Sequence, residues 1–297
     1  MIKSFLNYPG GKYRLLKQLL PLFPSEYTNM VDMFTGSAVV ATNVNDVHIL
    51  AYDSNTELIS LLNYIKETDI NDILNGINQI IKKYKLTDTS KYGYNYYGLS
   101  SQKGLSNYNK TGFNKLRYDY NNSNIKGIDK YVYLYALIIF GFNNQMRFNN
   151  KGMFNNPTGK RDFNLQMKTK LIDFKNTVKQ KDITFINSDF RLIDSNIPDA
   201  FYYADPPYLI TNAVYNSTMG GWTELDELDL YKKLDEIDLV GNKFAFSNVF
   251  YSKGKKNNLL IDWSKNYHIH HLNFDYSNSN YQTSGKGETD EVLITNY

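Results

Sequence analysis

The chain has 297 residues, a formal net charge of +3 and a hydrophobic fraction of 42%. Its length suffices for one large α/β domain with an insertion, and its hydrophobic fraction suffices for a buried core. The mild positive charge permits a polyanionic partner without requiring one. Because there is no cysteine, disulfides, thiolate metal sites and thiolate nucleophiles are excluded.

No segment reads as a membrane span or a secretory signal. The longest apolar stretch, residues 131–142, is shorter than the roughly 20 residues that a transmembrane helix needs. The first residues lack the apolar core of a signal peptide. We therefore expect a cytoplasmic monomer without membrane contact.

Taken in chain order, short apolar runs alternate with helical patterns. Strands are predicted over residues 28–34, 48–53, 183–189, 200–205, 244–249 and 290–297. Helices are predicted over residues 12–23, 55–84 and 224–239, where apolar residues recur at three- and four-residue spacing. The alternation predicts an α/β fold with a doubly wound sheet.

The middle of the chain breaks this alternation. Residues 85–127 are a mixture of Gly, Asn, Ser and Tyr without a sustained period, which predicts a loop-rich surface. Residues 131–140 read as helical or buried, and a second loop-like stretch follows them. We expect one α/β domain built from residues 1–59 and 167–297, interrupted by a mainly helical domain at 60–166.

Acidic residues follow the predicted strands at the edge where open parallel sheets bind ligands. They are Asp32, Asp53, Asp189 and Asp205. Gly36 stands in a tight strand-to-helix turn, and Asp53, 17 residues on, is placed to accept the hydroxyls of a ribose. This pair predicts a nucleoside-containing cofactor, although a structural turn capped by Ser37 and Asp53 is an equal alternative. Neither a dinucleotide fingerprint nor a phosphate-loop spacing is present.

The stretch Asp205-Pro206-Pro207-Tyr208 directly follows a strand-forming run. The prolines remove two backbone donors, so the Asp205 carboxylate and the Pro206 carbonyl face a pocket as acceptors only. Such a pair suits the amino group of a nucleobase, and Tyr208 offers a flat face for stacking. The alternative is a Pro-Pro turn that only ends an edge strand. Finding Asp205 neutralised by a lysine in a sealed interior, with no cavity adjoining it, would contradict the acceptor interpretation.

Four motifs in order, "NYPGGKYRLL", "DMFTGSAVV", "RFNNKGMFNNPTG" and "YADPPY", resemble the Dam family of DNA N6-adenine methyltransferases, the D12 class of the alpha group. The resemblance covers nearly the whole chain. It implies a class I S-adenosylmethionine-dependent methyltransferase sheet of Rossmann-like type with an inserted, mainly helical target-recognition domain. Asp205, Pro206, Pro207 and Tyr208 match the catalytic motif.

The resemblance also implies a set of ligand-binding residues. Those that match cofactor-contacting positions are Tyr8, Lys12, Phe34, Gly36, Asp53, Asp189, Phe190 and Asp205. Those that match or flank DNA-contacting positions are Asn143, Gln145, Arg147, Lys151, Pro157, Lys160 and Arg161. Ala38 departs from the family, because a second glycine is usual there. Gln145 departs from the apolar residue of close GATC-specific relatives.

The implied reaction is methyl transfer from S-adenosylmethionine to N6 of an adenine flipped out of duplex DNA, within a site such as GATC or another that contains GAT. Residues 211–222 are expected to order over the flipped base. The role is restriction-modification or phage DNA protection, with a cognate restriction endonuclease as a partner that the resemblance allows. The alternatives are an N4-cytosine methyltransferase and an inactive, methyltransferase-like DNA-binding module. C5-cytosine methylation would need the missing cysteine.

Overall fold

The computed structural model describes residues 1–123, 125, 129–211, 221–273 and 289–297. It divides into two compact units. The helical unit comprises Met1–Pro9 and Glu57–Gln180, and the sheet unit comprises Gly10–Thr56 and Lys181–Tyr297. The functional division of the chain into residues 60–166 and the two flanking segments stays a prediction.

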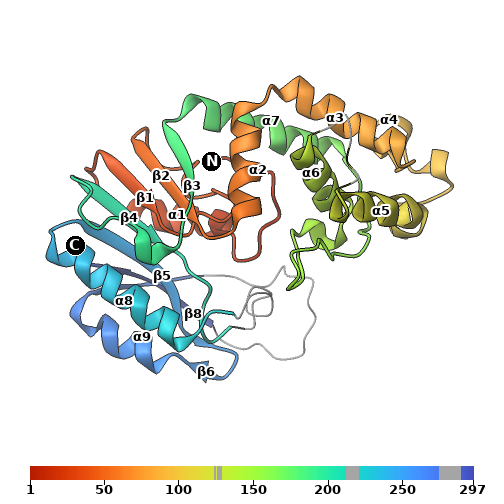
Figure 1. The fold of residues 1–297 in the computed structure, drawn as a ribbon. Helices are drawn as coiled ribbons and strands as arrows, with labels where there is room; N and C mark the ends of the chain where they lie inside the picture. The colour runs from red at the N-terminus through yellow and green to blue at the C-terminus, as the bar shows by residue number, and fades with distance from the viewer. Residues whose placement is uncertain (124, 126–128, 212–220, 274–288) are drawn as a thin grey trace. The chain divides into compact units, whose positions relative to one another are not determined.

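The sheet unit is built on one mixed sheet (Figure 1). Its strands are β1 (Asn29–Asp32), β2 (His48–Asp53), β3 (Ile183–Asn187), β4 (Ala200–Ala204), β5 (Lys243–Ser252), β6 (Lys255–Lys256), β7 (His268–Leu272) and β8 (Thr289–Thr295). Their order is β3-β2-β1-β4-β5-β8-β7, with β6 paired to β5. The first five strands of that order are parallel, whereas β8 is antiparallel to both of its neighbours. This arrangement confirms the predicted α/β class and the class I methyltransferase sheet.

Helices of three to 16 residues join and cover these strands. They are η1 (Lys12–Arg14), α1 (Leu16–Leu19), η2 (Leu20–Leu22), η5 (Phe190–Leu192), α8 (Glu224–Leu239), α9 (Asn258–Trp263) and η7 (Ser264–Asn266). In Figure 1, α8 and α9 lie side by side along the sheet. Leu230 and Leu234 of α8 pack with Tyr202, Phe244 and Phe246 in one buried cluster. Because both faces of the central strands are buried, their sequences are nearly continuous apolar runs.

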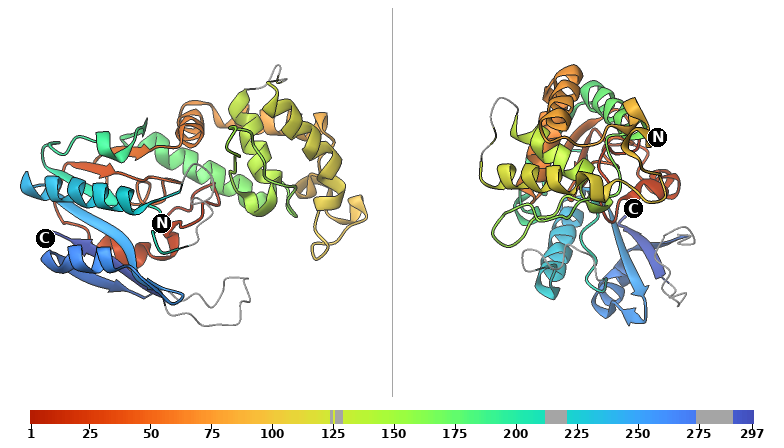
Figure 2. Two further views of the ribbon diagram at one scale, coloured as in Figure 1. Left: turned by 60° about the horizontal axis from the view of Figure 1, so that its bottom comes forward. Right: turned by 90° about the vertical axis from the view of Figure 1, so that its right-hand side faces the viewer.

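The helical unit contains α2 (Thr56–Glu67, whose first residue belongs to the sheet unit), α3 (Ile70–Lys83), α4 (Thr89–Tyr92), η3 (Asn95–Tyr97), α5 (Ser106–Asn121), α6 (Lys130–Phe140), η4 (Phe142–Asn144) and α7 (Leu165–Gln180). Its helices, coloured orange to green, pack against one another in both views of Figure 2. Every residue of α6 from Val132 to Phe140 is buried, and α3 and α5 both contact this helix. A helix that is apolar on all sides belongs in the centre of a core, as α6 does here.

Several predicted elements need correction. The stretch 85–127 is not mainly loop, because α5 is a helix of 16 residues within it. The predicted helix over 12–23 is broken into η1, α1 and η2, with a proline in the first turn of η2. The single helix predicted over 55–84 is two, since Asp69 caps a new helix at Ile70. Among the described helices, none has the length and apolar character that a bilayer span requires.

Candidate active site

The carboxyl ends of the central strands meet at one edge of the sheet. Strand β1 pairs in parallel with β2 on one side and β4 on the other, so the strand order reverses there. Asp32 ends β1, Asp53 ends β2 and Asp205 follows β4. This is the position at which open α/β sheets bind ligands.

The Asp205 carboxylate is the centre of a buried polar network. Its Oδ1 lies 2.8 Å from the Lys12 ammonium, which lies 3.5 Å from Oε1 of Glu291 on β8. The Tyr208 hydroxyl lies 3.2 Å from Asp205 Oδ1 and 3.1 Å from Glu291 Oε1. Since a hydroxyl has one hydrogen, Tyr208 donates to one carboxylate at a time. The network therefore links the catalytic motif to the N-terminal motif and to the last strand.

Lys12 carries the positive charge of this network. Burial lowers its pKa, but Asp205 and Glu291 outweigh burial, so the pKa of Lys12 is raised and the ammonium stays charged. The ammonium also lies 4.9 Å from the centre of the Tyr208 ring. Burial raises the pKa of Asp205 even though Lys12 opposes this shift. With both carboxylates ionised, the two carboxylates and one ammonium carry a net negative charge.

The interpretation of Asp205 as a hydrogen-bond acceptor for a base would be contradicted by a lysine partner in a sealed interior. The ion pair with Lys12 meets the first half of that condition. The other half, a sealed interior, is not met. The Asp205 side chain is 17% exposed, whereas those of Lys12 and Glu291 are 5% exposed. The Asp205 side chain thus keeps some exposure, while its Oδ1 is held by Lys12 and Tyr208.

The glycine loop after β1 folds back on Asp53. The Gly36 amide donates to Asp53 Oδ2 at 3.0 Å, and the Asn55 amide donates to Oδ1 at 2.9 Å. These bonds match the alternative in which Asp53 caps the turn, and each oxygen keeps a lone pair for a ligand. Gly36 has φ 49° and the buried Ala38 has φ 57°. Both are left-handed, so the glycine usual in the family at position 38 suits the backbone better than alanine does.

Asp32 is buried, and only one of its two carboxylate oxygens has a hydrogen-bond partner within the described part of the chain. Its Oδ2 accepts from the Thr35 hydroxyl at 3.0 Å, whereas Oδ1 has no hydrogen-bond partner among the described residues. Burial, with a smaller contribution from the nearby Asp205 and Asp53 charges, raises the pKa of Asp32 to about 7. A buried acceptor without a donor is costly, which is an indication that a ligand supplies one.

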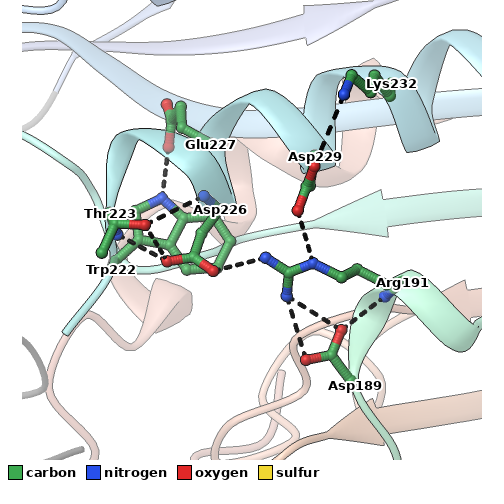
Figure 3. Close-up of polar contacts among 8 residues, drawn as sticks. All are labelled: Asp189, Arg191, Trp222, Thr223, Asp226, Glu227, Asp229 and Lys232. Atoms are coloured by element: carbon green, nitrogen blue, oxygen red, sulfur yellow. Dashed lines mark hydrogen bonds and ion pairs between the residues drawn. The ribbon is translucent and has the colours of Figure 1, made fainter. Parts of the chain in front are cut away.

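The segment after β3 is held by Arg191 (Figure 3). The guanidinium contacts both oxygens of Asp189 at 3.2 and 3.3 Å, and it bonds Asp226 at 2.6 Å and Asp229 at 2.8 Å on α8. It also covers the Phe190 ring at 4.4 Å. Arg191 thus fixes both residues predicted to flank the cofactor adenine, through contacts that the sequence reasoning missed.

An aromatic group lies beside that segment. Phe34 of the glycine loop lies 5.4 Å from Phe190 and 5.7 Å from Trp222, and Phe190 lies 5.6 Å from Trp222. The Trp222 indole donates to Glu227 on α8, as Figure 3 shows. Both phenylalanines were predicted to contact the cofactor, and Trp222 was not. Of the segment 211–222 that was predicted to close over the base, residues 212–220 lie outside the described residues.

The predicted DNA-contacting residues all belong to the helical unit. Two antiparallel bridges, Gly141 with Thr158 and Phe148 with Phe154, join the two segments that carry most of them. The exposed members are Asn143, Lys151, Pro157, Lys160 and Arg161, whereas Gln145 and Arg147 are half-buried. Tyr8, predicted to contact the cofactor, is also in the helical unit and is half-buried.

Arg147 is fixed within this loop pair. Its Nε donates to the Asn155 side chain and its Nη2 to the Asn155 carbonyl, both at 2.9 Å. Asn156 holds the same region by donating to the carbonyls of Phe142 and Gln145. The guanidinium is therefore oriented before any ligand arrives.

Sequence reasoning missed Glu291 as well as Arg191 and Trp222. Glu291 lies in the strand predicted over residues 290–297, but a lone acidic residue in a strand pattern carries no sign of burial. Arg191 directly follows Asp189-Phe190, and its three carboxylate partners come from two separate segments. Such groupings become visible only when the sheet and α8 bring the segments together.

The sheet order and the acidic residues at its carboxyl edge define a class I methyltransferase fold. Residues 8–278 match the family model of the D12 class N6 adenine-specific DNA methyltransferases, and the chain belongs to this family.

Relatives differ in how much of their length the chain covers. It is 40% identical to the type II methyltransferase M.FokI of Planomicrobium okeanokoites and 37% identical to the modification methylase StsI of Streptococcus sanguinis, in each case over 100% of this chain and 43% of the relative. It is 27% identical to a DNA adenine methylase of Haemophilus influenzae over 69% of this chain and 64% of that protein. The chain thus spans less than half the length of the first two relatives.

Proposed function

We propose that this chain transfers a methyl group from S-adenosylmethionine to N6 of an adenine flipped out of duplex DNA. The observation that carries the proposal is the partly exposed Asp205 carboxylate, held beside Tyr208 at the carboxyl end of β4 in a member of an N6 adenine-specific family. The amino group of a base is unreachable inside the stack, so the reaction requires extrusion of the target.

The residues at the sheet edge fit the cofactor. Asp53 has acceptor capacity left for a ribose, the unpartnered Oδ1 of the buried Asp32 suits a polar donor, and Phe34, Phe190 and Trp222 offer apolar surface for an adenine ring. When bound, S-adenosylmethionine supplies a methyl group on a positively charged sulfur. The net negative charge around Lys12 favours such a cation.

The chain's own residues then orient the target base. The Asp205 carboxylate and the Pro206 carbonyl each accept a hydrogen bond from the amino group of the base. These two bonds make the nitrogen lone pair available instead of delocalised into the ring. The Tyr208 ring stacks on the base, and its hydroxyl is held by Glu291 or Asp205 so that the ring cannot rotate away. Orientation of the base and the methyl donor, together with fixed charges, accounts for the rate acceleration. No covalent intermediate on the enzyme is needed.

DNA recognition is assigned to the helical unit. Arg147, already oriented by Asn155, has the planar fork that binds guanine in the major groove, and Lys151, Lys160 and Arg161 are exposed for phosphates. A site that contains GAT, such as GATC, remains a hypothesis. The names of the first relatives, a type II methyltransferase and a modification methylase, favour a role in restriction-modification with a cognate endonuclease.

Two other functions are less well supported. The family is described as N6 adenine-specific, which disfavours N4-cytosine methylation. An inactive DNA-binding module would have no reason to keep Asp205, Lys12 and Tyr208 in one hydrogen-bonded network. Calorimetry separates this case, because an inactive module without a cofactor site gives no heat with S-adenosylmethionine.

The test is methylation of duplex DNA by the 297-residue chain, with sequencing that reports the modified base and its context. We expect N6-methyladenine, and we expect Asp205→Ala to abolish transfer while the cooperative unfolding transition is kept. Asp262→Ala, which removes an exposed carboxylate on α9, is the matched control and should methylate at the wild-type rate. If Asp205→Ala methylates as fast as the control, the acceptor role of Asp205 is wrong.

A further inference from the structure

The sheet unit carries a cluster of lysines that the predicted DNA-contacting residues do not include. Strand β5 turns back into β6 through Lys253 and Gly254, and the pairs Ser252 with Lys255 and Tyr251 with Lys256 close the hairpin. The three lysines of this hairpin, Lys253, Lys255 and Lys256, are all exposed.

The hairpin lies on the catalytic side of the sheet. Strand β5 is parallel to β4, and Ala204, the residue before Asp205, pairs with Phe246. Asp205 is therefore level with Ser247, and β5 continues for five more residues to Ser252, which at about 3.3 Å per residue is roughly 17 Å beyond that level. A duplex whose extruded base reaches Asp205 must lie on this same side.

The three lysines lack direct carboxylate partners in the described part of the chain, although the pKa of Asp262 is lowered by Lys265 and, to a smaller extent, by the charge of Lys256. Two exposed carboxylates near the hairpin have nearer partners, since Asp290 lies 2.7 Å from the His271 ring and Asp262 lies 2.7 Å from the Lys265 ammonium. An exposed cluster of three lysines attracts a polyanion.

The turn of the hairpin has left-handed backbone at both of its residues. Lys253 has φ 50° and Gly254 has φ 83°, as a two-residue type I′ turn requires. Glycine and asparagine are the usual residues at such positions, so a lysine at Lys253 costs backbone energy. The Asn257 amide after the hairpin donates to the Phe250 carbonyl at 2.9 Å, and its side chain donates to the buried Glu227 at 3.2 Å. Strain that persists in a well-held turn is typical of a functional position.

We propose that Lys253, Lys255 and Lys256 form a binding site for the phosphate backbone of duplex DNA. The proposal rests on the proposed function, because it takes DNA as the substrate whose base enters the Asp205 site. The hairpin contacts give no base specificity. They hold the duplex against the catalytic edge of the sheet, so that recognition need not depend on the helical unit alone.

The test measures the affinity of the 297-residue chain for a duplex oligonucleotide at several salt concentrations. The hairpin variant is Lys253→Asn with Lys256→Gln, in which asparagine tolerates the left-handed backbone. The matched control is Lys232→Gln with Lys243→Gln, which removes the same charge from exposed lysines on α8 and at the amino end of β5.

Each phosphate contact contributes about 0.9 to the slope of log affinity against log salt. We therefore expect the hairpin variant to lower the slope by about 2, whereas the control keeps the wild-type slope. Between 50 and 200 mM salt, the wild type should then lose about tenfold more affinity than the hairpin variant loses. Both variants should bind S-adenosylmethionine as the wild type does, which shows that the sheet unit is folded.

The outcomes separate the two proposals. If the wild type methylates adenine and the hairpin variant keeps the wild-type slope, the hairpin proposal is overturned and the proposed function stands. If the wild type binds DNA with the lysine-dependent slope but transfers no methyl group, the proposed function fails and the hairpin site stands. Failure of the wild type to bind duplex DNA overturns both.

Discussion

Glu291 shows how a buried side chain can act on the chemistry through others. Its carboxylate accepts from Tyr208 at 3.1 Å and lies 3.5 Å from Lys12, and the residue is buried. It competes with Asp205 for the same ammonium and the same hydroxyl hydrogen. The position of Glu291 therefore sets how strongly Lys12 neutralises Asp205.

We expect Glu291→Gln to lower the single-turnover methylation rate about tenfold or more, because a hydrogen bond to a charged group contributes about 1.5 to 3 kcal/mol. The loss should appear in the rate constant and not in the affinity for DNA. Tyr208→Phe removes the hydroxyl that links the two carboxylates, so the effects of the two variants should be less than additive in a double-mutant cycle. Fully additive losses would show that Glu291 does not act through Tyr208.

Asp32 gives a prediction about pH. Its pKa is raised by burial from 3.8 to about 7 in the folded protein. Because the folded state holds this proton more tightly than the unfolded chain does, unfolding releases it between about pH 4 and 7, and stability falls as the pH rises through that window. Asp32→Asn should remove this loss, which amounts to up to about 4 kcal/mol. Urea unfolding at pH 5 and pH 8 measures it, and a stability difference between variant and wild type that is the same at both pH values would contradict the assignment.

At the scale of elements, strands were easier to predict than helices. Strands β1 and β4 are almost wholly buried, and β2 is partly buried, so all three are compact apolar runs that end on or before an acidic residue. Helix α5 was missed although Asn109, Phe113, Leu116 and Tyr120 are its buried residues and recur at helical spacing. One of the four buried residues is polar, and the rest of the helix is rich in Asn, Lys and Tyr. The apolar residues therefore show no clear helical periodicity in the sequence. The buried Asn109 side chain exchanges two hydrogen bonds with Thr87, 22 residues away, and this partner is not evident from the sequence.

Gly112 in the middle of α5 was a second reason to predict a loop, and it has a packing role. A Cβ added there would lie 2.0 Å from the Tyr84 carbonyl oxygen. We expect Gly112→Ala to destabilise the chain by about 2 kcal/mol or more, although alanine favours helices. Lys110→Ala, on the exposed face of the same helix, should change stability by less than about 0.5 kcal/mol. Chemical unfolding of both variants decides the question, and equal effects would exclude close packing at Gly112.

At the scale of the whole molecule, the residues proposed for catalysis and those proposed for DNA contact lie in different units of the chain. Asp205, Tyr208, Lys12 and Asp53 belong to the sheet unit, whereas Arg147 and the other predicted DNA-contacting residues belong to the helical unit. The sequence predicted the fold and the catalytic motif because short motifs carry them. It did not predict the networks around Lys12 and Arg191, because these depend on which segments the topology brings together.

Because the two groups lie in different units, substitutions in the helical unit should change DNA recognition without changing cofactor affinity. Arg147→Gln should lower kcat/KM for the cognate duplex by a factor of about 5 to 150, since a bidentate contact to a base contributes about 1 to 3 kcal/mol. It should also relax the preference at one position of the site, with cofactor affinity unchanged. Arg161→Gln, which removes an exposed cation bonded only weakly to Tyr94 at 3.4 Å, should weaken all sequences alike. Asn155→Ala controls for the loop, because it removes one of the bonds that orient Arg147 while leaving the guanidinium in place. If Arg147→Gln leaves the site preference unchanged while it lowers stability as Asn155→Ala does, the arginine only holds the loop, and base reading must come from other residues of the helical unit.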